Sequence, residues 1–276
     1  MSKITVHTVM IPTNLEKDIN LLIIADMHID FHSSRKENLK ELVQIIEQLN
    51  PNYILIPGDS IQSHKSSISN TDFIFKELGN IAPTILSLGN HELEALRDGL
   101  NLEWFYNLER FSQVYPLDNS SITIDNIQFT GFSPSLESYL PKTKNPDLFL
   151  EELINTSIQI DPNSIFNIML SHTPDFITDE TLRKNLLLAS YNLFISGHKH
   201  NGCVPEFLEK SFKDRGLIGP YFSLFPNKCR GIIDVYNSKL FISKGYRKIT
   251  QENVIMNNID KLFDNDIHQL ILTKKK

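Results

Sequence analysis

Short, almost entirely apolar runs recur along the chain, and each is followed by a polar turn that often contains glycine. The clearest run covers residues 19–25 (INLLIIA), which are continuously apolar after the first positions. A run of this kind is typical of a strand that is buried on both faces of a sheet. The same pattern predicts buried strands at residues 53–56, 84–88, 166–170 and 192–195.

Helices are predicted between these strands. Over residues 35–49, apolar side chains recur at three- and four-residue spacing and form one stripe, and Asn50-Pro51 ends the pattern. Further helices are predicted at residues 71–78, 148–157 and 179–188. The alternation of strands and helices indicates βαβ units with right-handed crossovers, so we expect parallel strands.

Other parts of the chain favour hairpins. Residues 121–124 and 127–130 flank Asp125-Asn126, which predicts a tight turn between two strands. Strands are also expected at residues 231–236, 239–243 and 266–272.

The predicted fold class is therefore α/β, with two stacked mixed β-sheets flanked by helices. No repeat, low-complexity tract or linker divides the sequence. We expect a single domain over residues 1–276, with residues 201–230 as a candidate insertion on the substrate side.

Composition and charge exclude several classes of protein. The net charge of −6 and the pI near 5.8 disfavour nucleic-acid binding, because phosphate backbones favour a basic surface. No apolar run approaches the roughly 20 residues of a membrane-spanning helix, and residues 1–14 lack the pattern of a secretory signal. Two cysteines, Cys203 and Cys229, are too few for a disulfide framework. We therefore expect a cytoplasmic protein without a transmembrane segment.

Side chains that can bind metals gather at the ends of the five buried strands. The carboxyl ends of strands in α/β sheets form the crevice in which ligands bind. Five of the nine histidines lie at these ends. The clusters are Asp26-Met27-His28, Gly58-Asp59, Gly89-Asn90-His91-Glu92, Ser171-His172 and Gly197-His198-Lys199-His200. We expect the fold to bring these groups to one rim.

Histidine, aspartate and asparagine together supply nitrogen and oxygen ligands for borderline divalent metals. Seven candidates are too many for one ion, whereas two ions that share a bridging carboxylate would use them all. Two divalent ions, two aspartates and a bridging hydroxide would leave one positive charge, which attracts an anionic phosphate. Each residue alone would be interpreted as an ordinary turn or cap residue. The set as a whole favours a metal site.

The five motifs occur between Asp26 and His200 in an order that resembles that of the calcineurin-like metallophosphoesterase superfamily. Gly-His-Lys-His-Asn-Gly, the aromatic-rich stretch after it and the hairpin at residues 231–244 are similar to one bacterial branch. That branch includes YkuE-like phosphoesterases and UDP-diacylglucosamine pyrophosphatases. The resemblance implies an α/β/β/α sandwich and metal-dependent hydrolysis of phosphate esters.

Carried over residue by residue, the resemblance implies seven ligands and one catalytic side chain. The ligands would be Asp26, His28 and His200 for one metal, Asn90, His172 and His198 for the other, and Asp59 as the bridge. A hydroxide that bridges the metals would attack phosphorus in line with the leaving oxygen. His91 would stabilise the developing charge or protonate the leaving group.

The predicted activity is that of a phosphodiesterase or pyrophosphatase with two divalent ions. We predict manganese, with iron, zinc and cobalt as alternatives, because nitrogen and oxygen ligands admit all four. A phosphomonoesterase is the main alternative activity. A nuclease is a weaker alternative because no basic stripe is visible, and a metal-free interaction scaffold should have lost ligands that this chain retains.

Three positions depart from the pattern of the relatives. Gln62 stands where many have an aspartate that orients the histidine of Gly-Asn-His. A neutral amide can still hydrogen-bond His91, but it would not favour the imidazolium as a carboxylate would, so we predict a modestly weaker acid-catalysis step. Asp30 stands where glycine is common and adds a carboxylate near the site. Lys199 replaces a threonine between two of the implied ligands, and we expect it to be solvated.

The segment after His200 leaves two interpretations open. Its apolar side chains are Phe207, Leu208, Phe212, Leu217, Ile218, Tyr221, Phe222, Leu224 and Phe225. An exposed patch beside the metals would suggest a lipid-like substrate, in place of a small phosphate ester, and peripheral contact with a membrane. Alternatively, these side chains simply pack on the sheet.

Overall fold

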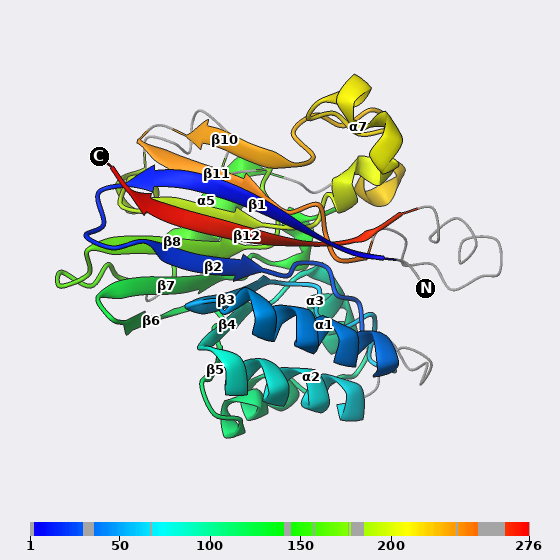
Figure 1. Cartoon of the computed structure of the whole chain (residues 1–276), viewed down its shortest axis with the longest axis horizontal. Helices are drawn as coiled ribbons and strands as arrows, with labels where there is room; N and C mark the ends of the chain where they lie inside the picture. The colour runs from blue at the N-terminus through cyan, green and yellow to red at the C-terminus, as the bar shows by residue number, and fades with distance from the viewer. Residues whose placement is uncertain are drawn as a thin grey trace.

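Two mixed β-sheets of six strands each stack face to face in the part of the chain that the structure describes (Figure 1). The structure is a computed structural model that describes residues 3–29, 36–66, 68–140, 145–156, 158–175, 177, 185–235, 237–247 and 263–275. Helices pack on the outer face of each sheet, so the predicted α/β class with two stacked sheets is confirmed.

The first sheet contains, in spatial order, β1 (Ile4–Thr13), β12 (Asn265–Lys274), β2 (Ile19–Ile23), β3 (Tyr53–Pro57), β4 (Thr84–Ser87) and β5 (Val114–Pro116). The strands from β2 to β5 run parallel to one another, and β1 runs parallel to β12. The direction changes only between β12 and β2, which are antiparallel.

The second sheet contains, in spatial order, β10 (Gly231–Val235), β11 (Ser238–Ile242), β9 (Leu193–Ser196), β8 (Phe166–Ser171), β7 (Ile127–Phe132) and β6 (Ser120–Ile124). Its four central strands are parallel, and each edge strand forms an antiparallel hairpin with its neighbour. The β6–β7 turn has Asp125 at φ 50° and Asn126 at φ 62°. Residues of these types adopt positive φ readily in two-residue hairpin turns, which explains the predicted turn.

Helices of different lengths connect the strands. They are α1 (Lys36–Leu49), α2 (Ile68–Ile81), α3 (Asn90–Arg97), α4 (Glu103–Tyr106), α5 (Pro146–Ile154), α6 (Leu186–Ala189) and α7 (Glu206–Phe212). Short 3-10 turns occur at Asn107–Arg110, Leu136–Ser138, His200–Cys203 and Pro220–Phe222. Among the described residues, no helix has the length and apolarity needed to cross a membrane.

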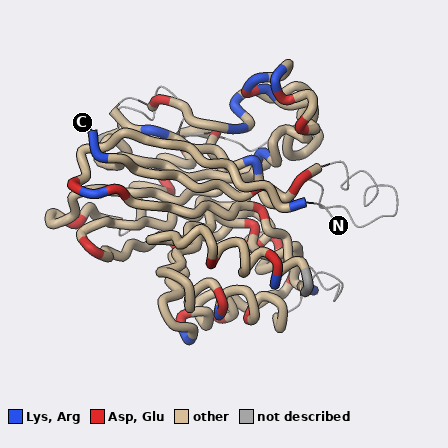
Figure 2. The backbone as a smooth tube through the Cα atoms, viewed as in Figure 1, with Lys and Arg blue, Asp and Glu red and all other residues tan. Residues whose placement is uncertain are grey.

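Alternating side chains of the buried strands enter two different cores. Leu22 and Ile54 pack toward α1 and α2, whereas Leu21 and Leu55 pack between the two sheets. A third core lies between the second sheet and α5 and α6. Because both faces of β2 and β3 are covered, their sequences are continuously apolar instead of alternating. Charged residues accordingly lie mainly on loops, helices and strand ends (Figure 2).

The structure also contains elements that the sequence pattern did not predict. β5 has only three residues, and α3 begins inside a site motif, so neither has a periodic apolar pattern of its own. α2 is longer than the predicted helix because it begins at Ile68. The predicted start of the first helix at Arg35 and residues 179–184 of a later one lie outside the described residues, as does Asp30.

Candidate metal centre

The seven candidate ligands lie at the carboxyl ends of five strands. Asp26 and His28 follow β2, Asp59 follows β3, Asn90 begins α3 after β4, His172 follows β8, and His198 and His200 follow β9. β2, β3 and β4 are parallel, and so are β8 and β9, so within each sheet these loops emerge at one edge. All of these residues are buried except His200, which is partly exposed.

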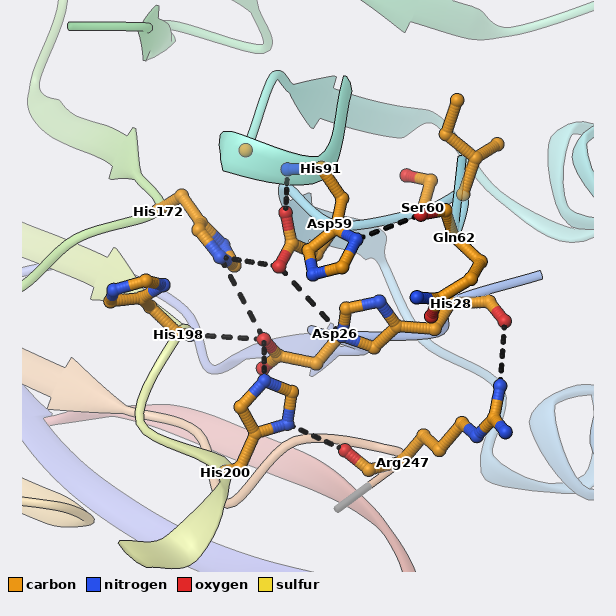
Figure 3. A network of polar contacts seen from close by, with 12 residues as sticks. Asp26, His28, Asp59, Ser60, Gln62, His91, His172, His198, His200 and Arg247 are labelled. Atoms are coloured by element: carbon orange, nitrogen blue, oxygen red, sulfur yellow. Dashed lines mark hydrogen bonds and ion pairs between the residues drawn. The ribbon is translucent and has the colours of Figure 1, made fainter. Parts of the chain in front are cut away.

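Six of the seven side chains form two groups that share Asp59. One group contains Asp26, His28, Asp59 and His200, and the other contains Asp59, His172 and His198. Within each group the candidate ligand atoms lie within 4.8 Å of one another. Figure 3 shows the Asp59 carboxylate between His172 and His28, with Asp26 on the side of His198 and His200. These are the groups that the resemblance implies.

Asn90 lies beside this cluster. The amide of the next residue, His91, donates to Asp59 Oδ1 at 2.9 Å. A Cβ on the preceding residue, Gly89, would lie only 2.3 Å from the same oxygen. Asn90 is 5% exposed, and within the described part of the chain its Oδ1 has no hydrogen-bond partner. A buried amide oxygen without a partner is costly, so this atom is suited to bind a cation.

Backbone carbonyls orient two of the histidines. His172 Nδ1 lies 2.6 Å from the carbonyl oxygen of Pro57, and His200 Nδ1 lies 2.8 Å from that of Arg247. A carbonyl can only accept, so each Nδ1 carries a proton, and Nε2 is the nitrogen that remains to bind a metal. His172 Nε2 lies 3.0 Å from Asp59 Oδ2, and His200 Nε2 lies 3.7 Å from Asp26 Oδ1. The nitrogens that can bind a metal therefore face the two carboxylates.

The backbone of the site is held in an unfavourable conformation. Positive φ values occur at Asp26 (56°), His28 (45°), Asp59 (52°), His198 (68°) and His200 (46°). Such conformations cost on the order of 1 kcal/mol or more for each residue other than glycine, and they concentrate at functional sites. The rest of the fold maintains these five residues in the geometry that makes their side chains converge.

The electrostatics of the cluster favour positive charge beside Asp59. Burial opposes ionisation of Asp59, but His172 and His91 outweigh it and hold the pKa of the carboxyl well below its usual range. Burial by itself would lower the pKa of His172, yet the adjacent Asp59 carboxylate raises it to about 9. Burial is also the main cause that lowers the pKa of His28 and of His198. These two imidazoles are therefore held neutral, which is the form that binds metals.

The residues present fit a pair of divalent ions. Within the described residues, three buried atoms of the candidate ligands have no hydrogen-bond partner: Asp26 Oδ2, His28 Nε2 and Asn90 Oδ1. His28 Nε2 lies 3.7 Å from Asp59 Oδ2, which is too long for a hydrogen bond. Buried donors and acceptors are normally paired, and metal coordination would satisfy these atoms.

Comparison with known proteins identifies the family. The calcineurin-like phosphoesterase family matches residues 19–202, which is more than half of the chain and includes every candidate ligand. The chain belongs to the calcineurin-like phosphoesterase family. The predicted superfamily is confirmed, whereas the bacterial branch stays a prediction.

Individual relatives of this chain are distant. It is 25% identical over 238 residues to the uncharacterized metallophosphoesterase Cj0846 of Campylobacter jejuni, covering 84% of this chain and 54% of that protein. The chain thus spans about half the length of the curated relative it matches. The solved structure of TT1561 from Thermus thermophilus matches with a TM-score of 0.46 and 11% identity, over 82% of this chain and 89% of that one. A dimetal phosphatase from Danio rerio gives a TM-score of 0.45 and 13% identity, over 82% and 87%.

The structure differs from expectation at two side chains near the candidate site. His91 Nδ1 donates to the backbone carbonyl of Gln62 at 2.8 Å, and not to the side-chain amide of Gln62. The Gln62 Oε1 atom is buried and, among the described residues, has no hydrogen-bond partner. Lys199 is buried instead of solvated and forms an ion pair with Asp175. Lys199, which lies between His198 and His200 in the sequence, therefore neutralises the Asp175 carboxylate.

Glu92 connects two of the motif loops, a role that the sequence analysis did not assign. Its carboxylate accepts hydrogen bonds from the backbone amides of Asp59 (2.9 Å), Ser60 (2.6 Å), Ile61 (3.0 Å) and Gly89 (2.8 Å). Burial and the nearby Asp59 charge raise the pKa of Glu92. The position of Glu92 in Gly-Asn-His-Glu could have indicated this role. An acidic residue at the third position of a helix can accept hydrogen bonds from the backbone amides that precede it.

Arg247 and Tyr139 also contact the site and had no signal in the sequence. The Arg247 amide donates to the carbonyl of Asp26, and its guanidinium donates to the carbonyl of His28 (Figure 3). Tyr139 is buried, with its ring centroid 5.2 Å from that of His198. Both residues lie outside the five motifs, so only the folded chain brings them to the site.

Proposed function

We propose that this chain is a dinuclear-metal hydrolase of phosphate esters. One metal would be bound by Asp26, His28 and His200, the other by Asn90, His172 and His198, and Asp59 would bind both. The observation that carries this proposal is that Asp59 belongs to both groups of candidate ligands. A single carboxylate has two oxygens and can therefore contact two ions.

Two divalent ions, when bound, would supply a nucleophile at neutral pH and bind the phosphoryl oxygens. The protein limits the negative charge at this place to Asp26 and Asp59, since histidine and asparagine side chains are neutral when they bind a metal. A site with a net positive charge would remain for an anionic substrate. The backbone carbonyls of Pro57 and Arg247 keep the Nε2 atoms of His172 and His200 directed into the cluster.

His91 is proposed to act on the leaving group. Its Nδ1 proton is held by the carbonyl of Gln62, so Nε2 is the atom that can carry and release a second proton. Burial works against the protonated form, but the Asp59 carboxylate outweighs it and raises the pKa of His91. A positively charged imidazole would stabilise an oxygen that becomes negative as its bond to phosphorus breaks.

Phosphodiesters or pyrophosphates are the proposed substrates, with phosphomonoesters as the alternative. The resemblance of the motifs to the bacterial branch that includes UDP-diacylglucosamine pyrophosphatases supports this proposal. Manganese is the proposed metal, with iron, zinc and cobalt as alternatives, because a donor set of nitrogen and oxygen atoms without a thiolate admits all four. Neither Cys203 nor Cys229 belongs to the two groups.

The test is hydrolysis of bis-p-nitrophenyl phosphate and of p-nitrophenyl phosphate after reconstitution with manganese, iron, zinc or cobalt. We expect turnover of the diester and metal binding by the parent, and loss of both in Asp59→Asn. Asp234→Asn is the matched control, because Asp234 is exposed on the edge strand β10 and belongs to neither group of candidate ligands. Equal activity of parent and Asp59→Asn would disprove the proposal, and turnover of the monoester alone would select the phosphatase.

A further inference from the structure

Residues 204–230 form a lobe that exposes large apolar side chains. It includes α7 and projects beyond the sheets (Figure 1). The exposed side chains are Phe207 (81%), Ile218 (41%), Tyr221 (39%), Phe222 (70%), Leu224 (72%) and Phe225 (65%). Five of them lie within residues 217–225, which we call the apolar tip. Of the two interpretations of this segment, packing on the sheet is therefore wrong for these six side chains.

The apolar tip has a defined backbone. The carbonyl of Gly202 accepts hydrogen bonds from the amides of Leu217 (2.8 Å) and Ile218 (3.1 Å). The amide of Phe225 donates to the carbonyl of Leu217 at 3.0 Å, and Ile218 forms an antiparallel bridge with Leu224. The apolar side chains are thus held outward by a closed network of backbone hydrogen bonds.

Arg230 fastens the base of the tip. Its buried guanidinium donates to the backbone carbonyls of Lys213 (2.7 Å), Arg215 (2.8 Å) and Asn201 (2.7 Å). A guanidinium has five N–H donors in a rigid plane, so one side chain can fix several loop segments at once. The lobe is therefore attached directly to Asn201, the residue that follows the candidate ligand His200.

Three aromatic residues of the tip have positive φ: Tyr221 (53°), Phe222 (60°) and Phe225 (49°). Bulky residues are rare in this region because Cβ crowds the backbone, and each such residue costs on the order of 1 kcal/mol. Exposed aromatic side chains on a strained backbone contribute little to folding. Strain of this kind is typical of segments that act on a partner.

The tip borders the candidate metal centre. The ring centroid of Tyr221 lies 6.3 Å from that of His198. The Tyr221 side chain is also hydrogen-bonded to Glu94 on α3, the helix that carries His91. Residues that follow Tyr221 directly, beginning with Phe222, are exposed. One short segment therefore reaches from the metal centre to the apolar surface.

Basic side chains accompany the apolar ones. Lys210, Lys213 and Arg215 are exposed on the lobe and Lys228 is partly exposed, whereas Glu206 and Asp214 are its exposed acidic residues. Residues 204–230 contain five basic and three acidic residues in a chain whose net charge is −6, and Figure 2 shows the blue segments of this lobe beside red ones. Aromatic and leucine side chains flanked by Lys and Arg are the chemistry of surfaces that insert into an anionic bilayer interface.

We propose that the apolar tip is a docking surface for membranes that contain anionic lipids. Phe222, Leu224 and Phe225 enter the interface, and the lysines and arginine of the lobe contact the lipid headgroups. Docking in this orientation brings the metal centre to the level of the headgroups, where it can reach phosphate esters attached to lipids. This last consequence rests on the proposed function, whereas the docking itself does not.

The test is co-sedimentation of the full chain with phosphatidylcholine vesicles, with and without phosphatidylglycerol. We expect binding to the anionic vesicles that weakens as salt is added, since salt screens the charge attraction. The double variant Phe222→Ser/Phe225→Ser should bind about tenfold more weakly or worse, because two buried phenyl groups are lost from the interface. The matched control is Ile154→Ser/Ile165→Ser, which removes two side chains of 60% and 61% exposure outside the lobe.

Three readouts keep this test separate from that of the proposed function. Asp59→Asn should bind vesicles like the parent, and the tip variant should hydrolyse the soluble p-nitrophenyl ester like the parent. Urea unfolding should be the same in the tip and control variants. The proposal is overturned if the parent does not sediment with anionic vesicles, or if tip and control variants bind equally. Self-association that only the tip variant abolishes, without vesicle binding, would assign the surface to a second copy of the chain instead.

Discussion

The backbone amide of Asp59 donates to the buried carboxylate of Glu92 at 2.9 Å, across the interface between the loop after β3 and the start of α3. The same carboxylate accepts from Ser60, Ile61 and Gly89, so one side chain satisfies four backbone donors in two motifs. These contacts stabilise a loop in which Asp59 has an unfavourable φ of 52°. Glu92 is therefore a positioning residue for the proposed bridging carboxylate.

We predict that Glu92→Gln destabilises the chain and weakens metal binding. The amide nitrogen of glutamine would face backbone N–H groups and leave buried donors unpaired, at a cost of about 2–4 kcal/mol. Urea unfolding should show the lower free energy of unfolding. Metal titration by calorimetry, under conditions in which the variant is folded, should show a weaker metal affinity. Glu109→Gln, at an exposed position, is the control. Unchanged stability and metal affinity in Glu92→Gln would contradict a positioning role.

The Gln62 side chain should matter much less than its position suggests. Because the carbonyl of Gln62 holds His91 Nδ1, the variant Gln62→Ala keeps this contact. We expect kcat within about threefold of the parent, whereas His91→Asn should lose about 10²–10⁴-fold, the usual contribution of a general acid. Steady-state kinetics on the diester will distinguish the two. A loss in Gln62→Ala as large as that in His91→Asn would show that the amide acts on the reaction.

Continuous apolar runs made the inner strands and the sandwich predictable from the sequence. Residues 19–25 and 53–56 are apolar throughout because β2 and β3 pack against α1 and α2 on one face and against the second sheet on the other. The groups around Asp59 could be anticipated because polar residues directly follow these strands. Because these strands are parallel, their carboxyl ends lie at the same edge of the sheet, and the residues that follow them come together there.

Contacts made through the backbone or from distant loops were not predictable. His91 and Gln62 interact through a main-chain carbonyl, which no side-chain pattern encodes. Arg247 reaches the site from a loop 47 residues after His200, although the Nδ1 contact with its carbonyl fixes that ligand. Exposure of Phe222 was equally undetermined, since an apolar residue in a sequence does not state whether a neighbour covers it.

Tyr139→Phe will show whether the Tyr139 hydroxyl has a partner at the site. The hydroxyl is buried and, among the residues that the structure describes, has no hydrogen-bond partner. An unpaired buried hydroxyl loses its hydration without compensation, so its removal should leave the free energy of unfolding equal or raise it by about 1 kcal/mol. Urea unfolding of the metal-free chain measures this value. A decrease of more than about 1 kcal/mol would mean that the hydroxyl is bound in the native state.

Cys229 should make the chain less stable in alkali. Burial raises the pKa of its thiol to about 11 in the folded chain, whereas an exposed thiol titrates at about 8.5. Between these values the unfolded chain binds fewer protons than the folded chain, so the free energy of unfolding falls as the pH rises. The variant Cys229→Ser cannot ionise in this range and should fall less steeply, by about 1–2 kcal/mol between pH about 8 and pH about 10. Urea unfolding of both chains across this interval measures the difference. Parallel curves for parent and variant would show that the thiol titrates alike in both states.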